Sequence, residues 1–80
     1  MLEQLKAQEK VIGVKQSRRA VLAELAKLVF VASDADPALT EPLEQMCCQR
    51  GIPVVDRFTM SELGQAAGIQ VGAAAAAVLK

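Results

Sequence analysis

The sequence predicts a small layered α/β protein, and three features of the chain support this prediction. Segments with helical periodicity alternate with short apolar segments along the chain. Residues 28–32 read Leu-Val-Phe-Val-Ala, a run rich in β-branched and aromatic residues that is typical of a strand covered on both faces. The chain has 80 residues, 52% hydrophobic and 22% charged, which suits one globular domain over residues 1–80. We therefore expect one sheet with layers packed on each side of it.

The N-terminal part of the chain is expected to hold two helices around a short apolar segment. Residues 2–9 have the pattern of a short amphipathic helix, with Glu and Lys at helical spacing. Val11–Val14 is a brief apolar run interrupted by Gly13, which fits a short strand or a tight turn. A second helix is expected over about Gln16–Glu24, with Ser17 near its start. Its apolar side comprises Ala20, Val21 and Leu25.

Capping residues mark the start of the next helix. Asp36 is a good N-cap, and Pro37 fits the first helical position, where its missing N–H costs nothing. Gly51 is expected to end this helix. The buried side of the helix is expected to hold Leu39, Leu43, Met46 and Cys47.

A strand and a fourth helix follow. The strand is expected at Ile52–Val55, another short apolar run. Thr59 and Glu62 have the spacing of a capping box, which opens a helix that Gly64 interrupts and Gly68 ends.

The alanine-rich end of the chain is ambiguous. Gly72 is followed by five alanines, Val78 and Leu79. Alanine propensity favours a helix. A central strand would benefit from the same small side chains, because they let helices pack closely on both faces of the sheet. Spacing alone leaves both readings open.

Several classes of protein are excluded by composition. Residues 1–10 carry alternating charge, which excludes a signal peptide, and the longest apolar run, Ala73–Leu79, is too short to span a bilayer. Cys47 and Cys48 are adjacent and poorly placed to bridge each other. The chain has no histidine and no other cysteine, so a zinc site lacks ligands. We expect a cytoplasmic protein with no metal and no other cofactor; a monomer is the default, since no long apolar stripe is left over.

No catalytic constellation is visible, and we expect the protein not to be an enzyme. The three serines, Ser17, Ser33 and Ser61, lack a histidine to activate them, as do the two cysteines. Asp34 and Asp36 are explained more simply by turn and capping roles than by a divalent ion.

Charge is balanced in total but uneven in position. The formal net charge is zero, which argues against a purely electrostatic nucleic-acid binder. Residues 10–19 include four basic residues and no acid, whereas residues 34–44 include four acids and no base. On charge alone, ordinary surface charge is the simpler explanation of this distribution. The residues concerned are Lys10, Lys15, Arg18, Arg19, Asp34, Asp36, Glu41 and Glu44.

The first segment that suggests binding is Gly13–Arg19. A glycine turn feeds the start of a helix, where exposed backbone N–H groups attract anions, and Lys15, Arg18 and Arg19 add positive charge. Phosphate is the expected ligand, and Gln16 offers both a donor and an acceptor to a base edge. A solvated helix face is the competing interpretation. The segment lacks the glycine and Lys-Ser/Thr pattern of a P-loop, so nucleotide hydrolysis is not supported.

The second segment is Leu63–Gly72. Its glycines bracket an Ile69-Gln70-Val71 tip whose two apolar residues, if exposed, invite a partner such as extruded bases. A tight connection with Ile69 and Val71 turned toward the core is the competing interpretation.

At these segments the sequence resembles the kink-turn-binding ribosomal-protein superfamily. That superfamily includes large-subunit ribosomal proteins of archaea and eukaryotes and small stand-alone bacterial relatives, and the length of this chain suits the bacterial branch. The resemblance is collinear over nearly the whole chain. It is carried by Gly13-Val14-Lys15-Gln16 with Arg19, by Val29-Phe30-Val31-Ala32-Ser33-Asp34-Ala35-Asp36-Pro37, and by Leu63-Gly64, Ala66, Gly68-Ile69, Val71-Gly72 and Ala73–Ala77.

The resemblance implies a three-layer α/β/α sandwich around a four-stranded mixed sheet, with the alanine run as a strand. It also implies that Gly13, Lys15 and Gln16, with Val14 between them, face tandem sheared G·A pairs in the widened major groove at the kink. Arg19, with Arg18 nearby, would hold backbone phosphate. The loop Gly68–Val71, comprising Gly68, Ile69, Gln70 and Val71, would cover the flipped-out loop nucleotide.

Three positions depart from the family pattern. Gln70 stands where the family usually has Glu, which removes a negative charge beside the RNA. Glu24 lies near a helix-ending glycine of many members, so that helix is expected to run on or to end differently. Lys15 is the bacterial choice where many archaeal and eukaryotic members have Asn, and Lys reads a base edge less directionally.

The sequence therefore predicts a non-catalytic protein that stabilises kink-turns in structured RNA, free or on the ribosome, with neither DNA nor a membrane as partner. One alternative is a ribosome-associated protein-interaction module that has lost RNA binding and docks through Ile69–Val71. Another is a fragment of an RNA ribose methyltransferase, since similar domains precede the catalytic domain in some of these enzymes. The chain has no cofactor-binding half for that reaction.

Overall fold

Helices and strands alternate along the chain in the computed structural model, which describes residues 2–80. The elements are α1 (Leu2–Ala7), β1 (Lys10–Ile12), α2 (Val14–Leu22), β2 (Ala26–Ala32), α3 (Pro37–Gln49), β3 (Val54–Phe58), α4 (Met60–Ala67) and β4 (Ala75–Leu79).

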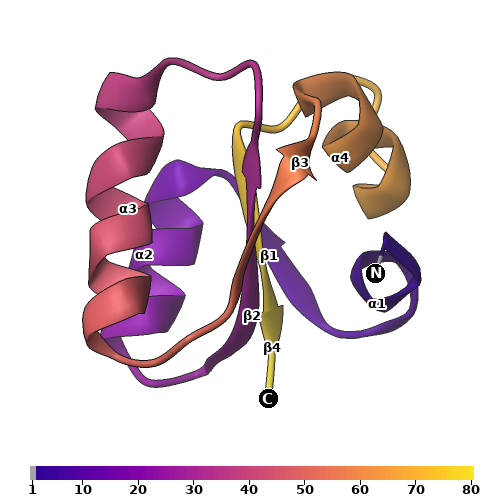
Figure 1. Cartoon of the computed structure of the whole chain (residues 1–80). Helices are drawn as coiled ribbons and strands as arrows, with labels where there is room; N and C mark the ends of the chain where they lie inside the picture. The colour runs from indigo at the N-terminus through magenta and orange to yellow at the C-terminus, as the bar shows by residue number, and fades with distance from the viewer. Residues whose placement is uncertain (1) are drawn as a thin grey trace.

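The four strands form one mixed sheet in the order β1-β4-β2-β3. β2 and β3 are parallel, whereas β4 runs antiparallel to both β1 and β2. Helices α2 and α3 cover one face of the sheet, and α1 and α4 cover the other (Figure 1). This is the three-layer α/β/α sandwich around a four-stranded mixed sheet that the family resemblance implied.

The alanine-rich segment is a central strand. β4 lies between β1 and β2, and Ala75, Ala76 and Ala77 are completely buried. Ala75 and Ala77 pack on the α2/α3 side, and Ala76 packs on the α1/α4 side. Small side chains here let helices on both faces approach the sheet, so burial overrides the helical propensity of alanine.

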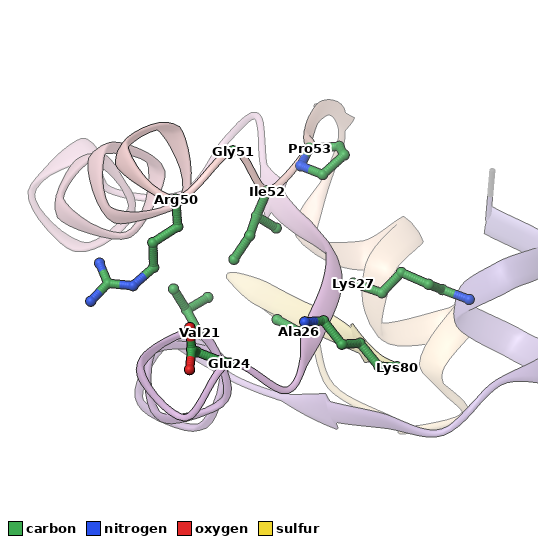
Figure 2. Close-up of a pocket in the computed structure, with 9 residues that line it drawn as sticks. All are labelled: Val21, Glu24, Ala26, Lys27, Arg50, Gly51, Ile52, Pro53 and Lys80. Atoms are coloured by element: carbon green, nitrogen blue, oxygen red, sulfur yellow. The ribbon is translucent and has the colours of Figure 1, made fainter.

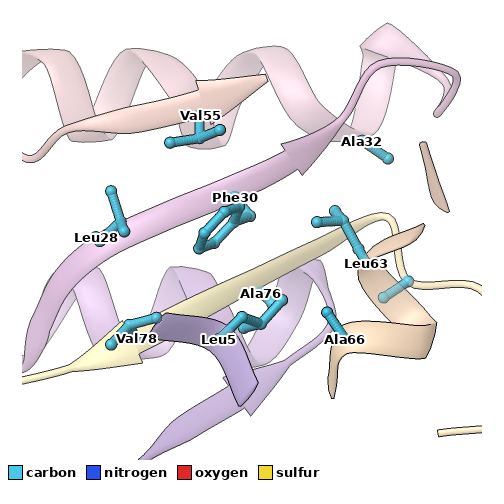
Figure 3. Packing of buried hydrophobic residues seen from close by; sticks show 10 residues of the cluster. Leu5, Leu28, Phe30, Ala32, Val55, Leu63, Ala66, Ala76 and Val78 are labelled. Atoms are coloured by element: carbon cyan, nitrogen blue, oxygen red, sulfur yellow. The ribbon is translucent and has the colours of Figure 1, made fainter. Parts of the chain in front are cut away.

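The core is aliphatic on both sides of the sheet, with Phe30 as its largest fully buried side chain. Figure 3 shows Phe30 from β2 among leucine, valine and alanine side chains of α1, α4, β3 and β4. The Phe58 ring lies at its edge, 6.3 Å from the Phe30 ring between centroids. Cys47 is buried and Cys48 is exposed, and neither forms a disulfide. Burial raises the pKa of the Cys47 thiol, so this residue behaves as a small apolar side chain.

Both predicted caps are confirmed. Asp36 accepts a hydrogen bond from the Ala38 N–H at 3.0 Å, and Pro37 opens α3. Thr59 and Glu62 form the reciprocal capping box of α4, with bonds of 2.9 and 3.2 Å. These motifs depend on neighbours within one turn, which is why the sequence reveals them.

Helix α2 is displaced from its predicted bounds. It begins at Val14 and ends at Leu22, whereas Gln16–Glu24 was expected. After Leu22 the chain turns through Glu24, whose φ of 61° is left-handed. The expectation that Leu25 lies on the buried side of α2 is therefore wrong: Leu25 is exposed, because the helix has already ended.

Three further expectations about elements need correction. Leu39 is exposed, because the face of α3 that meets the sheet carries Thr40, Leu43 and Cys47. β3 covers Val54–Phe58 and not Ile52–Val55, since it starts only after Pro53, which has no N–H to donate. Gly64 does not interrupt α4, which runs to Ala67 and ends at Gly68 with φ 82°.

Candidate nucleic-acid interface

The start of α2 presents backbone donors without a side-chain cap. Gly13 is the N-cap residue, with φ 104° and ψ 156°, a conformation that only glycine adopts readily. Among the described residues, 2–80, no side chain caps this helix end. The first N–H groups of a helix lack intrahelical partners, so this terminus offers donors and the positive end of the helix dipole to an anion.

Four polar side chains surround this helix start. Lys15, Gln16, Arg18 and Arg19 are all exposed, whereas Ser17 between them faces the sheet and is fully buried. Within residues 2–80 none of the three basic side chains is paired with a carboxylate. Basic residues in the first turns of a helix oppose its dipole, so their placement favours binding of an anion here.

In the loop after α4, one apolar side chain packs against the core and another is exposed to solvent. The Ile69 N–H donates to the Gly64 carbonyl at 3.0 Å, and the Ile69 side chain packs partly buried against the core on the α1/α4 side. Val71 is 71% exposed, and Gln70 is exposed beside it. The competing interpretation of an inward-turned loop therefore holds for Ile69 only.

Two hydrogen bonds attach the residues just after the loop to the start of α2 and to the end of β2. The Gly13 N–H donates to the Ala75 carbonyl at 2.7 Å, and the Ala32 N–H donates to the Ala74 carbonyl at 2.8 Å. The start of α2, the turn after β2 and the end of the loop before β4 are thereby brought together. All three connections lie toward the same end of the sheet in Figure 1. Residues that are distant in sequence thus share one end of the molecule.

A pocket of about 590 Å³ lies beside this loop. Apolar atoms come from the loop and from the first residue of α4, and polar groups are interleaved with them. Sequence reasoning identified its loop residues but missed those of α4 and of the turn after β2. The capping box located the start of α4, but no local pattern reveals that this start adjoins the loop. The lining residues are Asp34, Met60, Ser61, Gln65, Ile69, Gln70, Val71 and Gly72.

The carboxylates at this end act as helix caps. Asp36 caps α3, and the Asp34 side chain accepts a hydrogen bond from the Met60 N–H at 2.8 Å, at the start of α4. Over residues 2–80 no group of three or more His, Cys, Asp or Glu side chains is arranged to hold a metal ion.

A different pocket, of about 440 Å³, lies at the opposite end of the sheet, where α2 and α3 finish (Figure 2). Val21, Ala26 and Ile52 supply apolar surface, with Arg50 and Glu24 at its margin. Arg50 is the C-cap residue of α3, where a basic side chain offsets the negative end of the helix dipole, so this cation has a structural explanation. None of the residues predicted to bind RNA lines this pocket.

Fold and site together define a class of protein: a small three-layer α/β/α domain that presents an uncapped, basic helix start and an exposed aliphatic loop at one end of its sheet. The chain belongs to the ribosomal protein L7Ae/L30e/S12e/Gadd45 family, which matches residues 2–80. None of the helices within residues 2–80 is long and apolar enough to cross a membrane.

Three similar proteins illustrate the family. A protein of Bacillus pumilus named "RNA-binding protein" is 41% identical over 73 residues, which cover 91% of this chain and 89% of that one. The large ribosomal subunit protein eL8 of Halobacterium salinarum is 41% identical over 68 residues, 84% of this chain and 57% of the archaeal protein. The solved structure of a 15.5 kD RNA-binding protein of Giardia lamblia superposes with a TM-score of 0.91 at 28% identity, covering 99% of this chain and 70% of that one.

Proposed function

We propose that this protein binds structured RNA and stabilises the kink-turn, without catalysing a reaction. The observation that carries the proposal is that the uncapped α2 start and the loop Gly68–Val71 lie toward the same end of the sheet, where the Gly13 N–H donates to the carbonyl of Ala75, four residues beyond the loop. Similar proteins named for RNA binding, among them the one from Bacillus pumilus, support the same ligand class.

The two segments are suited to different parts of an RNA. At the start of α2, Lys15 and Gln16 reach the edges of the sheared G·A pairs, because a kink opens the major groove that is too narrow in regular A-form RNA. Arg18 and Arg19, one turn further along the exposed face, bind backbone phosphate. Contacts to base edges select the motif, and contacts to phosphate set its position.

The loop and its pocket suit an unstacked base. The exposed Val71 side chain, the partly buried Ile69 and the apolar part of Met60 offer a surface to a base flipped out at the kink. Gln70 adds an uncharged donor and acceptor beside this surface, where a carboxylate would repel phosphate.

The expected mechanism is a shift of population. Free RNA with this motif exchanges between extended and kinked conformers, and a protein that fits the kinked form alone favours it by its difference in affinity. The protein does not need to move, since the hydrogen bonds that hold the start of α2 and the end of β2 to Ala74 and Ala75 are present without RNA.

The direct test is titration calorimetry of the protein with a short RNA that contains a standard kink-turn. The matched control is the same RNA with its G·A pairs replaced by Watson–Crick pairs. We expect tight binding to the first RNA and a large loss with the second. Equal binding to both RNAs would contradict recognition of the kink-turn.

A protein-interaction module that has lost RNA binding is the second candidate, and the 71% exposure of Val71 favours a partner of either kind at this tip. Pull-down with and without nuclease distinguishes the two. A partner that is retained after nuclease treatment and lost in Val71→Ser would favour protein docking. Release by nuclease would favour RNA.

A further inference from the structure

The RNA-facing end holds an acidic side chain whose charge is unfavourable for the proposed ligand. Asp34 lies exposed in the turn after β2 and lines the pocket beside the loop. A carboxylate here repels phosphate, and this repulsion weakens RNA binding. A favourable role of Asp34 must therefore come from its contacts within the protein.

The contact that Asp34 makes is long-range in sequence. Its Oδ1 accepts a hydrogen bond of 2.8 Å from the Met60 N–H, 26 residues away. Met60 is the first residue of α4, so the carboxylate also lies at the positive end of the helix dipole. The local capping box of Thr59 and Glu62 already caps this helix. The Asp34 bond therefore adds a connection between two segments, beyond what the helix needs to begin.

Met60 is in turn bonded to the far side of the loop. Its carbonyl accepts a hydrogen bond of 3.0 Å from the Ala73 N–H. Packing is close at this point, because a Cβ added to Gly72 would lie 3.1 Å from the Met60 Cβ. Met60 lies in α4, whose helical φ and ψ fix the orientation of its carbonyl relative to its N–H, so holding one restricts the other. Asp34, Met60 and Ala73 thus form a continuous path from the turn after β2 to the end of the loop.

We infer that Asp34 is a positioning residue for the loop Gly68–Val71: its carboxylate fixes the start of α4 and, through Met60, holds the loop in the shape that covers the flipped-out nucleotide before RNA arrives. This inference rests on the proposed function for its consequence in RNA binding. A loop that is already ordered loses less conformational entropy when it binds, so affinity rises without a new contact to the ligand.

Two substitutions distinguish the effect of the hydrogen-bond acceptor on Asp34 from the effect of its negative charge. Asp34→Asn keeps an oxygen that can accept from the Met60 N–H and removes the negative charge. Asp34→Ala removes both. Positioning predicts that the Asn variant binds kink-turn RNA as tightly as the original protein, or more tightly, since repulsion of phosphate is lost. The Ala variant is expected to bind about tenfold more weakly, because the hydrogen bond to the Met60 N–H is lost.

The first measurement uses the free protein. Amide hydrogen exchange is followed at Ile69 and Ala73, which report on the loop, and at Val29, whose N–H is bonded to the Pro53 carbonyl and reports on opening of the whole sheet. Asp34→Ala is expected to speed exchange at Ile69 and Ala73 about tenfold relative to Val29, while Asp34→Asn leaves it unchanged. Asp36→Ala is the matched control, because it removes an acidic cap of α3 from the same turn without a contact to α4. Unchanged loop exchange in Asp34→Ala would overturn the inference.

The second measurement uses RNA. The affinities of the original protein, Asp34→Asn and Asp34→Ala are compared for a kink-turn RNA and for the same RNA without its flipped-out nucleotide. Asp34→Ala is expected to lose affinity for the complete RNA but not for the shortened RNA. General destabilisation of the protein would not make the loss of affinity depend on the flipped-out nucleotide. A penalty of equal size in Asp34→Asn, or on both RNAs, would overturn positioning. Failure of the original protein to prefer kink-turn RNA would contradict the proposed function and leave the exchange result as an independent test of the loop.

Discussion

Glu24 occupies a backbone position that glycine usually fills. It follows α2 with a φ of 61°, where a residue with a Cβ is strained. Because many members of the family have a helix-ending glycine near this position, Glu24 predicted that the helix runs on or ends differently. The helix end has ordinary geometry, and only the residue type at position 24 is unusual. The backbone N–H groups of Ala23 and Leu25 donate to carbonyls of α2, and these hydrogen bonds close the helix whichever residue stands at position 24.

The residue Glu24 gives a prediction about stability. Glu24→Gly is expected to raise the free energy of unfolding by about 0.5–1 kcal/mol, because the left-handed strain is removed at a modest entropic cost. The change in the free energy of unfolding is measured by urea denaturation followed by circular dichroism. Ala23→Gly is the control, since Ala23 has a φ of −83° and gains nothing from glycine. A stabilisation of equal size in both variants would contradict the explanation by strain.

Ser17 is a buried polar residue whose hydroxyl has no hydrogen-bond partner within residues 2–80. Its neighbours in sequence face the solvent, whereas Ser17 faces the sheet. A buried unpaired hydroxyl costs about 1–3 kcal/mol, and a methyl group in its place does not.

Ser17→Ala is therefore expected to stabilise the protein by about 1 kcal/mol, measured as the shift of the urea midpoint at constant slope. Ser61→Ala, at an exposed position of α4, is the control for the difference in helix propensity. Destabilisation by Ser17→Ala would mean that the hydroxyl does form a hydrogen bond.

The basic end of α2 gives a prediction about recognition at the level of single residues. Lys15→Ala and Gln16→Ala are expected to reduce the preference for RNA with G·A pairs, because these side chains face base edges in the proposed complex. Arg19→Ala is expected to weaken binding to all RNAs by about 1–3 kcal/mol, since it removes a phosphate contact. Calorimetry with matched RNAs measures both effects. An equal effect of all three substitutions on every RNA would contradict this division of roles.

At the scale of the element, the loop after α4 depends on a glycine inside that helix. A Cβ at Gly64 would lie 2.1 Å from the Val71 carbonyl oxygen, which is a steric clash. The sequence suggested that Gly64 interrupts the helix. The structure shows instead that it allows the loop to pass close over an intact helix.

Gly64→Ala is accordingly expected to destabilise the protein by about 1–3 kcal/mol, the usual cost of overpacking, and to weaken RNA binding by displacing the loop. Thermal unfolding and calorimetry measure the two effects. Gln65→Ala, the neighbouring exposed position, controls for the change in helix composition in the measurement of stability. If Gly64→Ala leaves stability unchanged, the loop does not rest on α4 as described.

At the scale of the whole molecule, the formal charges sum to zero, but basic and acidic residues are concentrated in different segments. The basic side chains at the proposed interface are Lys15, Arg18 and Arg19, and the acidic turn with Asp34 and Asp36 lies at the same end of the sheet. Phosphate is therefore attracted to one part of this end and repelled from another, which restricts the orientation of the RNA.

This distribution predicts a moderate dependence of affinity on salt. About three phosphate contacts correspond to a slope of about −2 to −3 in a plot of log K against log salt concentration. Titrations across a range of potassium chloride concentrations measure the slope. A slope that implies ten or more contacts would contradict a compact interface built around the start of α2.

The sequence by itself determined the features that depend on near neighbours. The caps at Asp36 and at Thr59 with Glu62, and the helix end at Gly68, were predicted from residues because their hydrogen bonds close within one turn. The α/β class followed from the periodicity of apolar residues. The two candidate binding segments were predicted from local chemistry, with glycine and basic residues in one and apolar residues between glycines in the other.

Only the tertiary structure decided what depends on distant contacts. The alanine run is a strand because β1 and β2 bond to it on both edges and helices cover both faces, whereas its propensity favours a helix. Leu25 and Leu39 are exposed because of where α2 ends and how α3 is rotated on the sheet. The connection of Asp34 to Met60, and of Gly13 to Ala75, joins residues with no common pattern in the sequence. Such contacts are set by the packing of the whole chain, since burial over many residues outweighs the preference of any one segment.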